Sequence, residues 1–315
     1  MIISCLLILL SLLILFAGAE CLVLGSSSIA SRLGVSPLII GLTIVAFGTS
    51  SPELVVSVKA ALAGQGDIAL GNVLGSNSFN IGVILGLTAL ICPIPVHLQI
   101  IRFDSPIALV VALILPLMML DGVLTRIEGA LLFVALLSYI FWNIHITRKQ
   151  EKLTVADIDE IPSKSKRHWS IDLAMIVGGL ILLLFGSNLL VDNSILVAKS
   201  LNVSDAVIGL TIVAAGTSMP ELATSVLAAL RKQPDIAIGN VVGSNIFNIV
   251  GILGIAGFVA PINSNSINPM DYLMVILYSV LLLPLIFTGR KLIRIEGVFL
   301  LSVYGIYLWL LWPKS

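Results

Sequence analysis

The sequence has 315 residues, of which 58% are hydrophobic and 11% are charged. A typical soluble domain is about half apolar and about a quarter charged, so this composition argues against a water-soluble enzyme. The 17 Lys and Arg residues balance the 17 Asp and Glu residues and form no basic patch, which argues against a nucleic-acid partner. Because a membrane span takes about 20 apolar residues, we expect an all-α membrane protein with many spans.

Ten apolar segments predict ten transmembrane helices. In chain order they cover residues 2–24, 37–63, 68–91, 104–120, 125–146, 171–196, 205–230, 236–260, 270–288 and 293–312. The longest polar stretch, residues 147–170, is interpreted as a linker. We therefore expect a five-span unit in residues 1–146, the linker, and a second five-span unit in residues 171–315.

The two units are copies of each other. Residues 40–54 (IGLTIVAFGTSSPEL) recur at 208–222 (IGLTIVAAGTSMPEL), and residues 71–81 (GNVLGSNSFNI) recur at 239–249 (GNVVGSNIFNI), both at an offset of 168. Because each copy is expected to cross the membrane five times, an odd number, the second copy starts from the opposite side. The sequence thus predicts two inverted five-helix repeats, an architecture of many secondary transporters.

The distribution of basic residues predicts the orientation in the cell membrane. If the N-terminus lies outside, the side that carries the 147–170 linker holds most of the Lys and Arg residues. The positive-inside rule assigns that side to the cytoplasm. We expect both termini outside and the linker in the cytoplasm.

Two acidic residues lie deep within apolar segments. They are Glu53 and Glu221, which occupy equivalent positions in the two copies, whereas the other acids lie in loops or near segment ends. A carboxylate at this depth costs at least a few kcal/mol and is by default a functional-site hypothesis. No basic residue lies near mid-span except Lys59, nearly two helical turns from Glu53. We therefore expect the two carboxylates to bind a cation from solution.

Other oxygen ligands surround these acids in the sequence. Pro52 removes a backbone donor and weakens its helix, which frees carbonyl groups. Thr49 and Ser50 share a helical face with Glu53, and Ser76 and Asn80 form a polar face in the next segment. The second copy supplies Thr217, Ser218, Glu221, Ser244 and Asn248. Such hard oxygen donors suit Ca²⁺ or Na⁺ and suit zinc or copper poorly.

These motifs resemble the sodium/calcium exchanger family, within the wider cation/calcium exchanger superfamily. The resemblance rests on G-T-S-x-P-E in one span and G-N-x-x-G-S-N-x-x-N in the next, each present twice. It implies a calcium site between Glu53 and Glu221, completed by the main-chain carbonyls of Thr49 and Thr217. It also implies flanking sodium sites that use the hydroxyls of Thr49, Thr217, Ser76 and Ser244 and the carbonyls of Ala46 and Ala214. Asn80 and Asn248 would lie at the middle, and Ser50 and Ser218 would line the path.

One position departs from part of the family. Some prokaryotic relatives resemble this chain but carry Asp where it has Asn248, so two formal negative charges stand here rather than three. In the proton-coupled branch of the superfamily, the corresponding segment resembles G-N-A-x-E instead of G-T-S-x-P-E. The sequence therefore favours sodium as the coupling ion.

We expect an antiporter rather than an enzyme, one that exchanges Na⁺ for Ca²⁺ by alternating access and extrudes Ca²⁺ electrogenically. The two ions and the lipid bilayer are the expected partners, and no prosthetic group is expected. A proton-coupled or potassium-dependent calcium antiporter shares the same fold. A cation channel with an acidic selectivity site and a scaffolding membrane protein are rivals from other classes; counter-ion-dependent flux would reject the channel.

Overall fold

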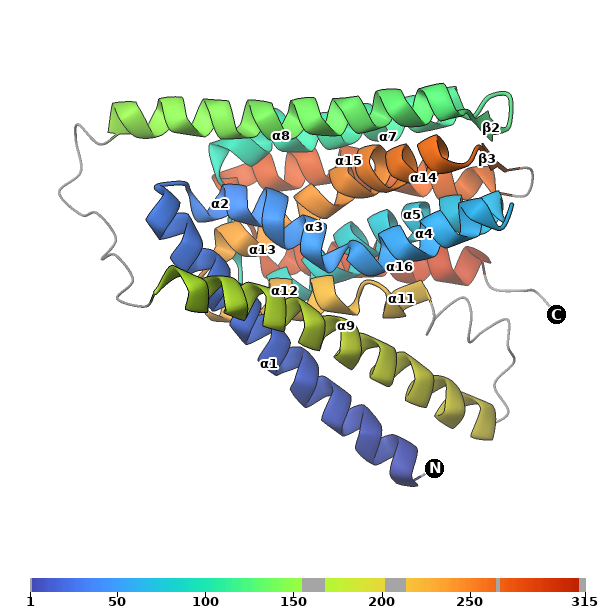
Figure 1. Cartoon of the computed structure of the whole chain (residues 1–315), viewed down its shortest axis with the longest axis horizontal. Coiled ribbons are helices and arrows are strands. Elements are labelled where there is room, and N and C mark those ends of the chain that lie inside the picture. The colour runs from blue at the N-terminus through green and yellow to red at the C-terminus, as the bar shows by residue number, and fades with distance from the viewer. Residues whose placement is uncertain (1, 155–167, 202–213, 265–266, 312–315) are drawn as a thin grey trace.

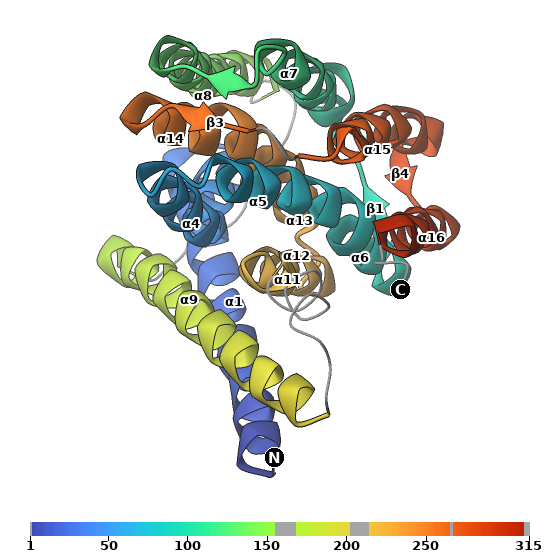
Figure 2. The same ribbon diagram turned by 90° about the vertical axis from the view of Figure 1, so that its right-hand side faces the viewer.

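The structure is a computed structural model that describes residues 2–154, 168–201, 214–264 and 267–311. The described chain is helical apart from four strands of two residues each. Most helices form a layered body, while α1 (Ile2–Leu33) and α9 (Trp169–Ser200) lie side by side and project from it (Figures 1 and 2).

The first half contains interrupted as well as continuous helices. After α1, the helices and strands in chain order are α2 (Pro37–Ile40), η1 (Gly41–Val45), α3 (Ala46–Thr49), α4 (Ser51–Leu62), α5 (Gly66–Phe79), η2 (Asn80–Leu85), α6 (Gly86–Ile91), β1 (Ile94–Pro95), η3 (Ile100–Asp104), α7 (Ser105–Met118), β2 (Val123–Leu124) and α8 (Arg126–Thr154). The segments η1, η2 and η3 are π-helical. Such turns inside α-helices are frequent at functional sites.

The described part of the second half follows the same plan. After α9 it contains α11 (Ala214–Gly216), α12 (Met219–Leu230), α13 (Pro234–Ile246), η5 (Phe247–Leu253), α14 (Gly254–Val259), β3 (Ile262–Asn263), α15 (Pro269–Phe287), η6 (Thr288–Arg290), β4 (Lys291–Leu292) and α16 (Arg294–Leu311). The π-helix η5 occupies the position that η2 has in the first half. The break between α11 and α12 likewise corresponds to the break between α3 and α4.

The expected all-α membrane class is confirmed, but the expected count of ten spans is not established. Eight described helices are long and apolar enough to cross a membrane, and the pair Pro37–Thr49 and Ser51–Leu62, bent by 48°, makes a ninth candidate. The remaining expected span, residues 205–230, which is the seventh in chain order, contains α12, which is too short to cross alone. Residues 202–213, which precede it, lie outside the described part of the chain.

The predicted ends of several segments need correction. The helix α1 continues to Leu33 rather than residue 24, and α8 continues to Thr154, into the stretch interpreted as a linker. Residues 149–152 (Lys-Gln-Glu-Lys) are good helix formers, so polarity alone does not end a helix there. Residues 155–167 of that stretch are outside the described residues.

Short strands join the two halves of the chain reciprocally. Strand β1 pairs with β4 through Ile94 and Leu292, and β2 pairs with β3 through Leu124 and Ile262. Because Ile94 and Ile262, and likewise Leu124 and Leu292, are 168 residues apart, the two pairings are equivalent under the repeat. Each half thus supplies one strand to each pairing.

Helices α1 and α9 approach each other through glycine. A Cβ atom on Gly179 would lie 2.7 Å from the carbonyl oxygen of Gly18 and 2.7 Å from the amide nitrogen of Leu22. Small residues permit such close backbone approach in membrane proteins. At one end of this pair, Arg32 forms an ion pair with Asp172 (2.8 Å).

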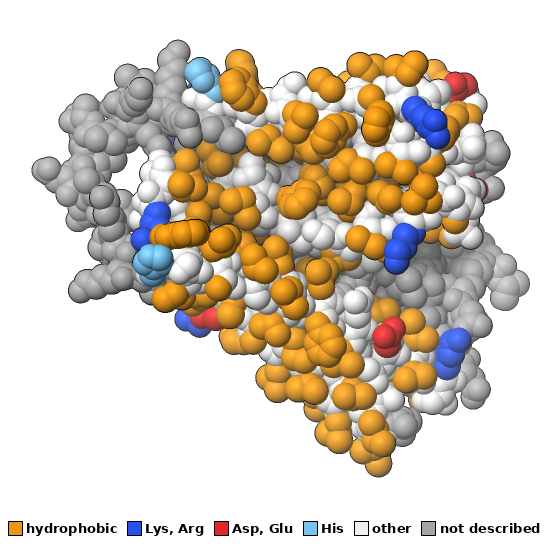
Figure 3. All heavy atoms as spheres, in the orientation of Figure 1, with side chains coloured by type: hydrophobic (Ala, Val, Ile, Leu, Met, Phe, Trp, Pro, Cys, Tyr) orange, Lys and Arg blue, Asp and Glu red, His pale blue; other side chains and the backbone are white. Residues whose placement is uncertain are grey.

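The surface is that of a protein surrounded by lipid. Hydrophobic side chains are spread across the face in Figure 3, and charged side chains lie toward its left and right sides. Large apolar residues on α1 and α8 are strongly exposed, including Leu13 and Phe141. Contiguous exposed apolar surface of this extent marks contact with a membrane.

Candidate functional site

The two glutamates predicted from the repeat lie in equivalent places. Glu53 lies in the first turn of α4 and Glu221 in the first turn of α12, and each is 1% exposed. Pro52 and Pro220 occupy the first turn of the same helices, where a missing N–H leaves no bond unmade. The positive end of each helix dipole therefore lies beside a carboxylate.

Each glutamate accepts a hydrogen bond from the serine of the other half. The Ser50 hydroxyl donates to Glu221 Oε1 (2.9 Å), and the Ser218 hydroxyl donates to Glu53 Oε1 (2.9 Å). These crossed bonds connect each glutamate to the break in the other half. The hydroxyls are neutral, so these bonds do not balance the two carboxylate charges.

Several buried oxygens of the predicted ligands have no hydrogen-bond partner among the described residues. They are Glu53 Oε2, Glu221 Oε2, Ser76 Oγ, Asn80 Oδ1, Asn248 Oδ1 and Thr217 Oγ1. Buried polar atoms are normally paired, and an unpaired group needs an explanation such as a missing ion. Here the glutamate oxygens and the amide oxygens are acceptors, so a cation would satisfy them.

The Thr49 side chain shows the same excess of acceptors. Its hydroxyl lies 3.1 Å from the carbonyl oxygen of Val45, 3.4 Å from that of Ala46 and 3.1 Å from Asn240 Oδ1. One hydroxyl has a single hydrogen to donate, so three acceptors share it. The Ala46 carbonyl also accepts from the Ser50 amide (3.0 Å).

Of the remaining predicted residues, Ser244 lies on α13, and Ala214 and Thr217 lie at the break between α11 and α12. Ser244 is fully buried with its hydroxyl 3.0 Å from that of Ser50. Thr217 follows α11 and is partly exposed, whereas its counterpart Thr49 is fully buried. Ala214 begins α11, and its side chain lies outside the described part of the chain.

Asn80 and Asn248 lie at the π-helices and bond to the opposite half rather than to the glutamates. Asn80 Nδ2 donates to Asn245 Oδ1 (3.0 Å), and Asn248 Nδ2 donates to Asn77 Oδ1 (2.9 Å). Their own amide oxygens are left with no described partner. The structure therefore puts these two predicted residues in a layer held by asparagine pairs.

Four asparagines that were not predicted as ligands form the frame of the site. Asn77 and Asn245 each donate from Nδ2 to the other's main-chain carbonyl (3.1 and 3.3 Å). Asn72 donates to the Glu53 carbonyl (3.1 Å), and Asn240 donates to that of Glu221 (3.4 Å). All four belong to the repeated G-N-x-x-G-S-N motif, and this repetition is the signal in the sequence that points to them.

Replacing Asn77 with Ala should destabilise the protein. The change removes the bond to the Asn245 carbonyl and leaves the buried Asn248 amide unpaired, and an unsatisfied buried group costs about 1–3 kcal/mol. We expect a lower thermal unfolding midpoint in detergent. Asn193→Ala is the control, because the amide of Asn193 is also buried but bonds within its own helix to Leu189. Equal midpoints for both variants would contradict the framing role.

These observations define a class: a helical membrane protein whose two repeats each bring a buried glutamate to one oxygen-rich site. A family model described as sodium/calcium exchanger protein matches residues 3–145 and 171–312. The chain therefore belongs to the sodium/calcium exchanger family, which is a family of transporters.

Individual relatives match along nearly the whole chain. A putative antiporter CaxA of Alkalimonas amylolytica is 40% identical over 324 residues, covering 100% of both chains. The sodium/calcium exchanger MaX1 of Methanosarcina acetivorans is 33% identical and covers 96% of this chain and 97% of its own. A solved structure of the sodium-calcium exchanger NCX_Mj has a TM-score of 0.83 and 32% identity, over 98% of this chain and 99% of that one.

Proposed function

We propose that this protein is an antiporter that exchanges Na⁺ for Ca²⁺ across the membrane. The main support for this proposal is the pair of buried glutamates. Each has one carboxylate oxygen that accepts a hydrogen bond from a neutral hydroxyl and one that has no partner among the described residues. A Ca²⁺ ion takes several oxygen ligands and would balance the two carboxylates. The carbonyls of Thr49 and Thr217 would complete its shell.

Sodium would use the same oxygens and their neighbours. We assign the hydroxyls of Thr49, Thr217, Ser76 and Ser244 and the carbonyls of Ala46 and Ala214 to it, with Ser50 and Ser218 lining the path. Two Na⁺ ions balance two carboxylates, and a third ion, held near Asn80 and Asn248, would leave a net positive charge. Such an exchange would be electrogenic, and an inside-negative potential would drive Na⁺ in and Ca²⁺ out.

The ten-span inverted repeat and its orientation are part of the same proposal. The equivalent β pairings and the crossed serine bonds support the inverted relation of residues 1–146 and 171–315. We place both termini outside and the 147–170 stretch in the cytoplasm. Alternating access would follow from movement of α1 and α9, which project from the body and pack on each other through glycine (Figure 2).

The test is Ca²⁺ uptake into proteoliposomes loaded with Na⁺, with the membrane potential clamped. We expect uptake that requires internal Na⁺, accelerates when the inside is positive, and does not require K⁺. Uptake that ignores Na⁺ but follows a pH gradient would refute sodium coupling and support the proton-coupled alternative. A flux that does not saturate and needs no counter-ion would indicate a channel.

A further inference from the structure

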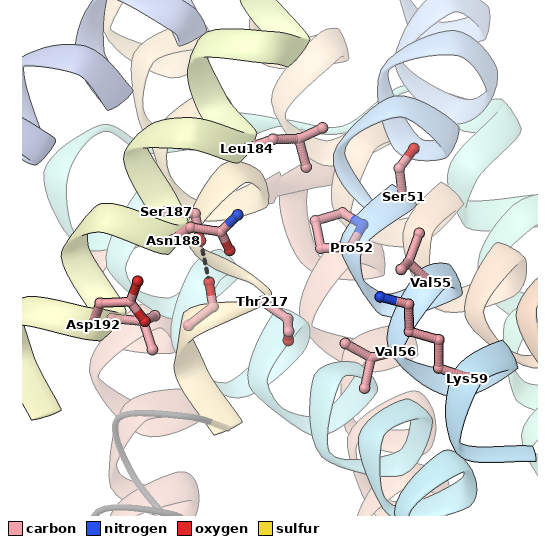
Figure 4. A pocket seen from close by; sticks show the side chains of 12 residues that line it. Ser51, Pro52, Val55, Val56, Lys59, Leu184, Ser187, Asn188, Asp192 and Thr217 are labelled. Atoms are coloured by element: carbon pink, nitrogen blue, oxygen red, sulfur yellow. Dashed lines mark hydrogen bonds between the residues drawn. The ribbon is translucent and has the colours of Figure 1, made fainter. Parts of the chain in front are cut away.

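A pocket of about 430 Å³ opens between α4, α9 and α11 (Figure 4). One wall is the face of α4 that carries Pro52, Val56 and Lys59, and the opposite wall is the face of α9 that carries Asn188 and Asp192. Lys59 and Asp192 are both exposed. The pocket thus carries one positive and one negative side chain on facing walls.

The floor of this pocket adjoins the candidate site. Gly216 and Thr217 line it from α11 and the residue that follows, and Ser218, next in the chain, bonds to Glu53. Pro52, on the other wall, directly precedes Glu53. The Ser187 hydroxyl ties α9 to this floor by donating to the Gly216 carbonyl (2.5 Å). The lining of the pocket is therefore continuous in the chain with the residues that hold the site.

The equivalent positions in the other half differ in charge, and several of them line an apolar pocket between α1 and α12. Lys59 corresponds to Leu227, which is 4% exposed, and Asp192 corresponds to Leu24. Asn188 corresponds to Glu20, whose carboxylate pairs with Arg231 through the Nε–H bond to Oε2 (2.9 Å). The fold is repeated, but the charged pocket is a feature of one side of the molecule. Its charges are therefore not dictated by the repeat.

We propose that this pocket is the vestibule through which cations reach the site, and that Lys59 and Asp192 set its preference for divalent over monovalent ions. The inference rests on the exchange function proposed above. A charge in a cleft with low-dielectric walls changes the local concentration of ions. The change is exponential in ion charge, so a factor f for Na⁺ becomes f² for Ca²⁺. Lys59 therefore disfavours Ca²⁺ more than Na⁺, and Asp192 has the opposite effect.

The experiment measures Ca²⁺ self-exchange in proteoliposomes that hold the full-length protein. The apparent KM for Ca²⁺ and the inhibition constant for Na⁺ are determined at a fixed ionic strength of about 0.1 M, where the Debye length is about 10 Å. The variants are Lys59→Gln and Asp192→Asn, with Arg126→Gln as the control, since Arg126 is exposed but does not line the pocket. Gel filtration checks that each variant is folded.

We expect Lys59→Gln to lower both constants, by about two- to threefold for Na⁺ and by the square of that factor for Ca²⁺. Asp192→Asn should raise both in the same relation, and Arg126→Gln should change neither. The effects should collapse at about 1 M salt, where the Debye length is about 3 Å. A structural perturbation of the site would not make the Ca²⁺ factor the square of the Na⁺ factor, and its effect would not vanish at high salt.

A second measurement protects the test against misfolding. Lys59→Cys, in a protein whose Cys5, Cys21 and Cys92 are replaced by Ser, is labelled with thiol reagents of equal size and opposite charge. The negative label should give the lower KM for Ca²⁺. If the wild-type protein is active but the two labelled forms of Lys59→Cys have equal constants, the vestibule inference is overturned and the exchange function stands. A wild-type protein without Na⁺-inhibited Ca²⁺ exchange would overturn the exchange function, and the inference with it.

Discussion

Replacing Glu53 with Gln, and separately Glu221 with Gln, is expected to impair Ca²⁺ exchange severely while leaving the protein folded. The amide keeps the shape of the side chain and can still accept the bond from Ser218 or Ser50. It removes one of the two charges that would hold the ion. Losing a charge-assisted interaction costs about 1.5–3 kcal/mol or more, which corresponds to a roughly 10- to 150-fold weaker Ca²⁺ affinity.

Two readouts separate loss of binding from loss of folding. Ca²⁺ should raise the thermal unfolding midpoint of the wild-type protein, because a ligand that binds the native state stabilises it, and at the same Ca²⁺ concentration it should raise the midpoint of either variant much less. Glu128→Gln is the matched control: its carboxylate accepts from the Thr125 amide at the start of α8, far from both breaks in sequence. Normal exchange by Glu53→Gln would remove that glutamate from the proposed site.

The second large effect is expected at the glycine contact between α1 and α9. Gly179→Ala would place a methyl group 2.7 Å from two backbone atoms of α1, which cannot move aside as a side chain could. Overpacking of this kind costs about 1–3 kcal/mol and would separate the two helices. We expect a lower unfolding midpoint and slower Ca²⁺ exchange, measured in the same detergent and proteoliposome assays.

The neighbouring residue supplies the control. A methyl group on Gly178 would meet nothing within 4 Å among the described atoms. Gly178→Ala should therefore be neutral or slightly stabilising, since Ala favours helix more than Gly by about 1 kcal/mol. If both variants behave alike, close approach at Gly179 does not hold the pair together.

The repeated motif makes the site predictable. Glu53 and Glu221 stand out because a buried acid is costly in an apolar segment, and the constant offset of 168 residues is enough to pair them. In the structure, Ser50 and Ser218 each donate a hydrogen bond to the glutamate of the other half. The spacing of residues along one helix could not indicate these bonds. Contacts between repeats depend on how the halves interlock, and that is a tertiary property.

The asparagine frame and the helix ends are harder to predict. Asn77 and Asn245 lie on apolar segments beside the predicted ligands, and only the three-dimensional crossing shows that each bonds to the other's carbonyl. The predicted ends of α1 and α8 are wrong because hydropathy reports where a chain can contact lipid. Helix formation continues beyond that boundary wherever propensity permits.

The reciprocal strand pairings bear on how the protein is made. Ile94 pairs with Leu292 and Leu124 pairs with Ile262, and both partners are synthesised much later. A nascent first half can enter the membrane, but it holds two unpaired strand edges and half of a buried polar layer until the second half arrives. We therefore expect each half to depend on the other for its buried hydrogen bonds, so that neither half is satisfied as a separate module.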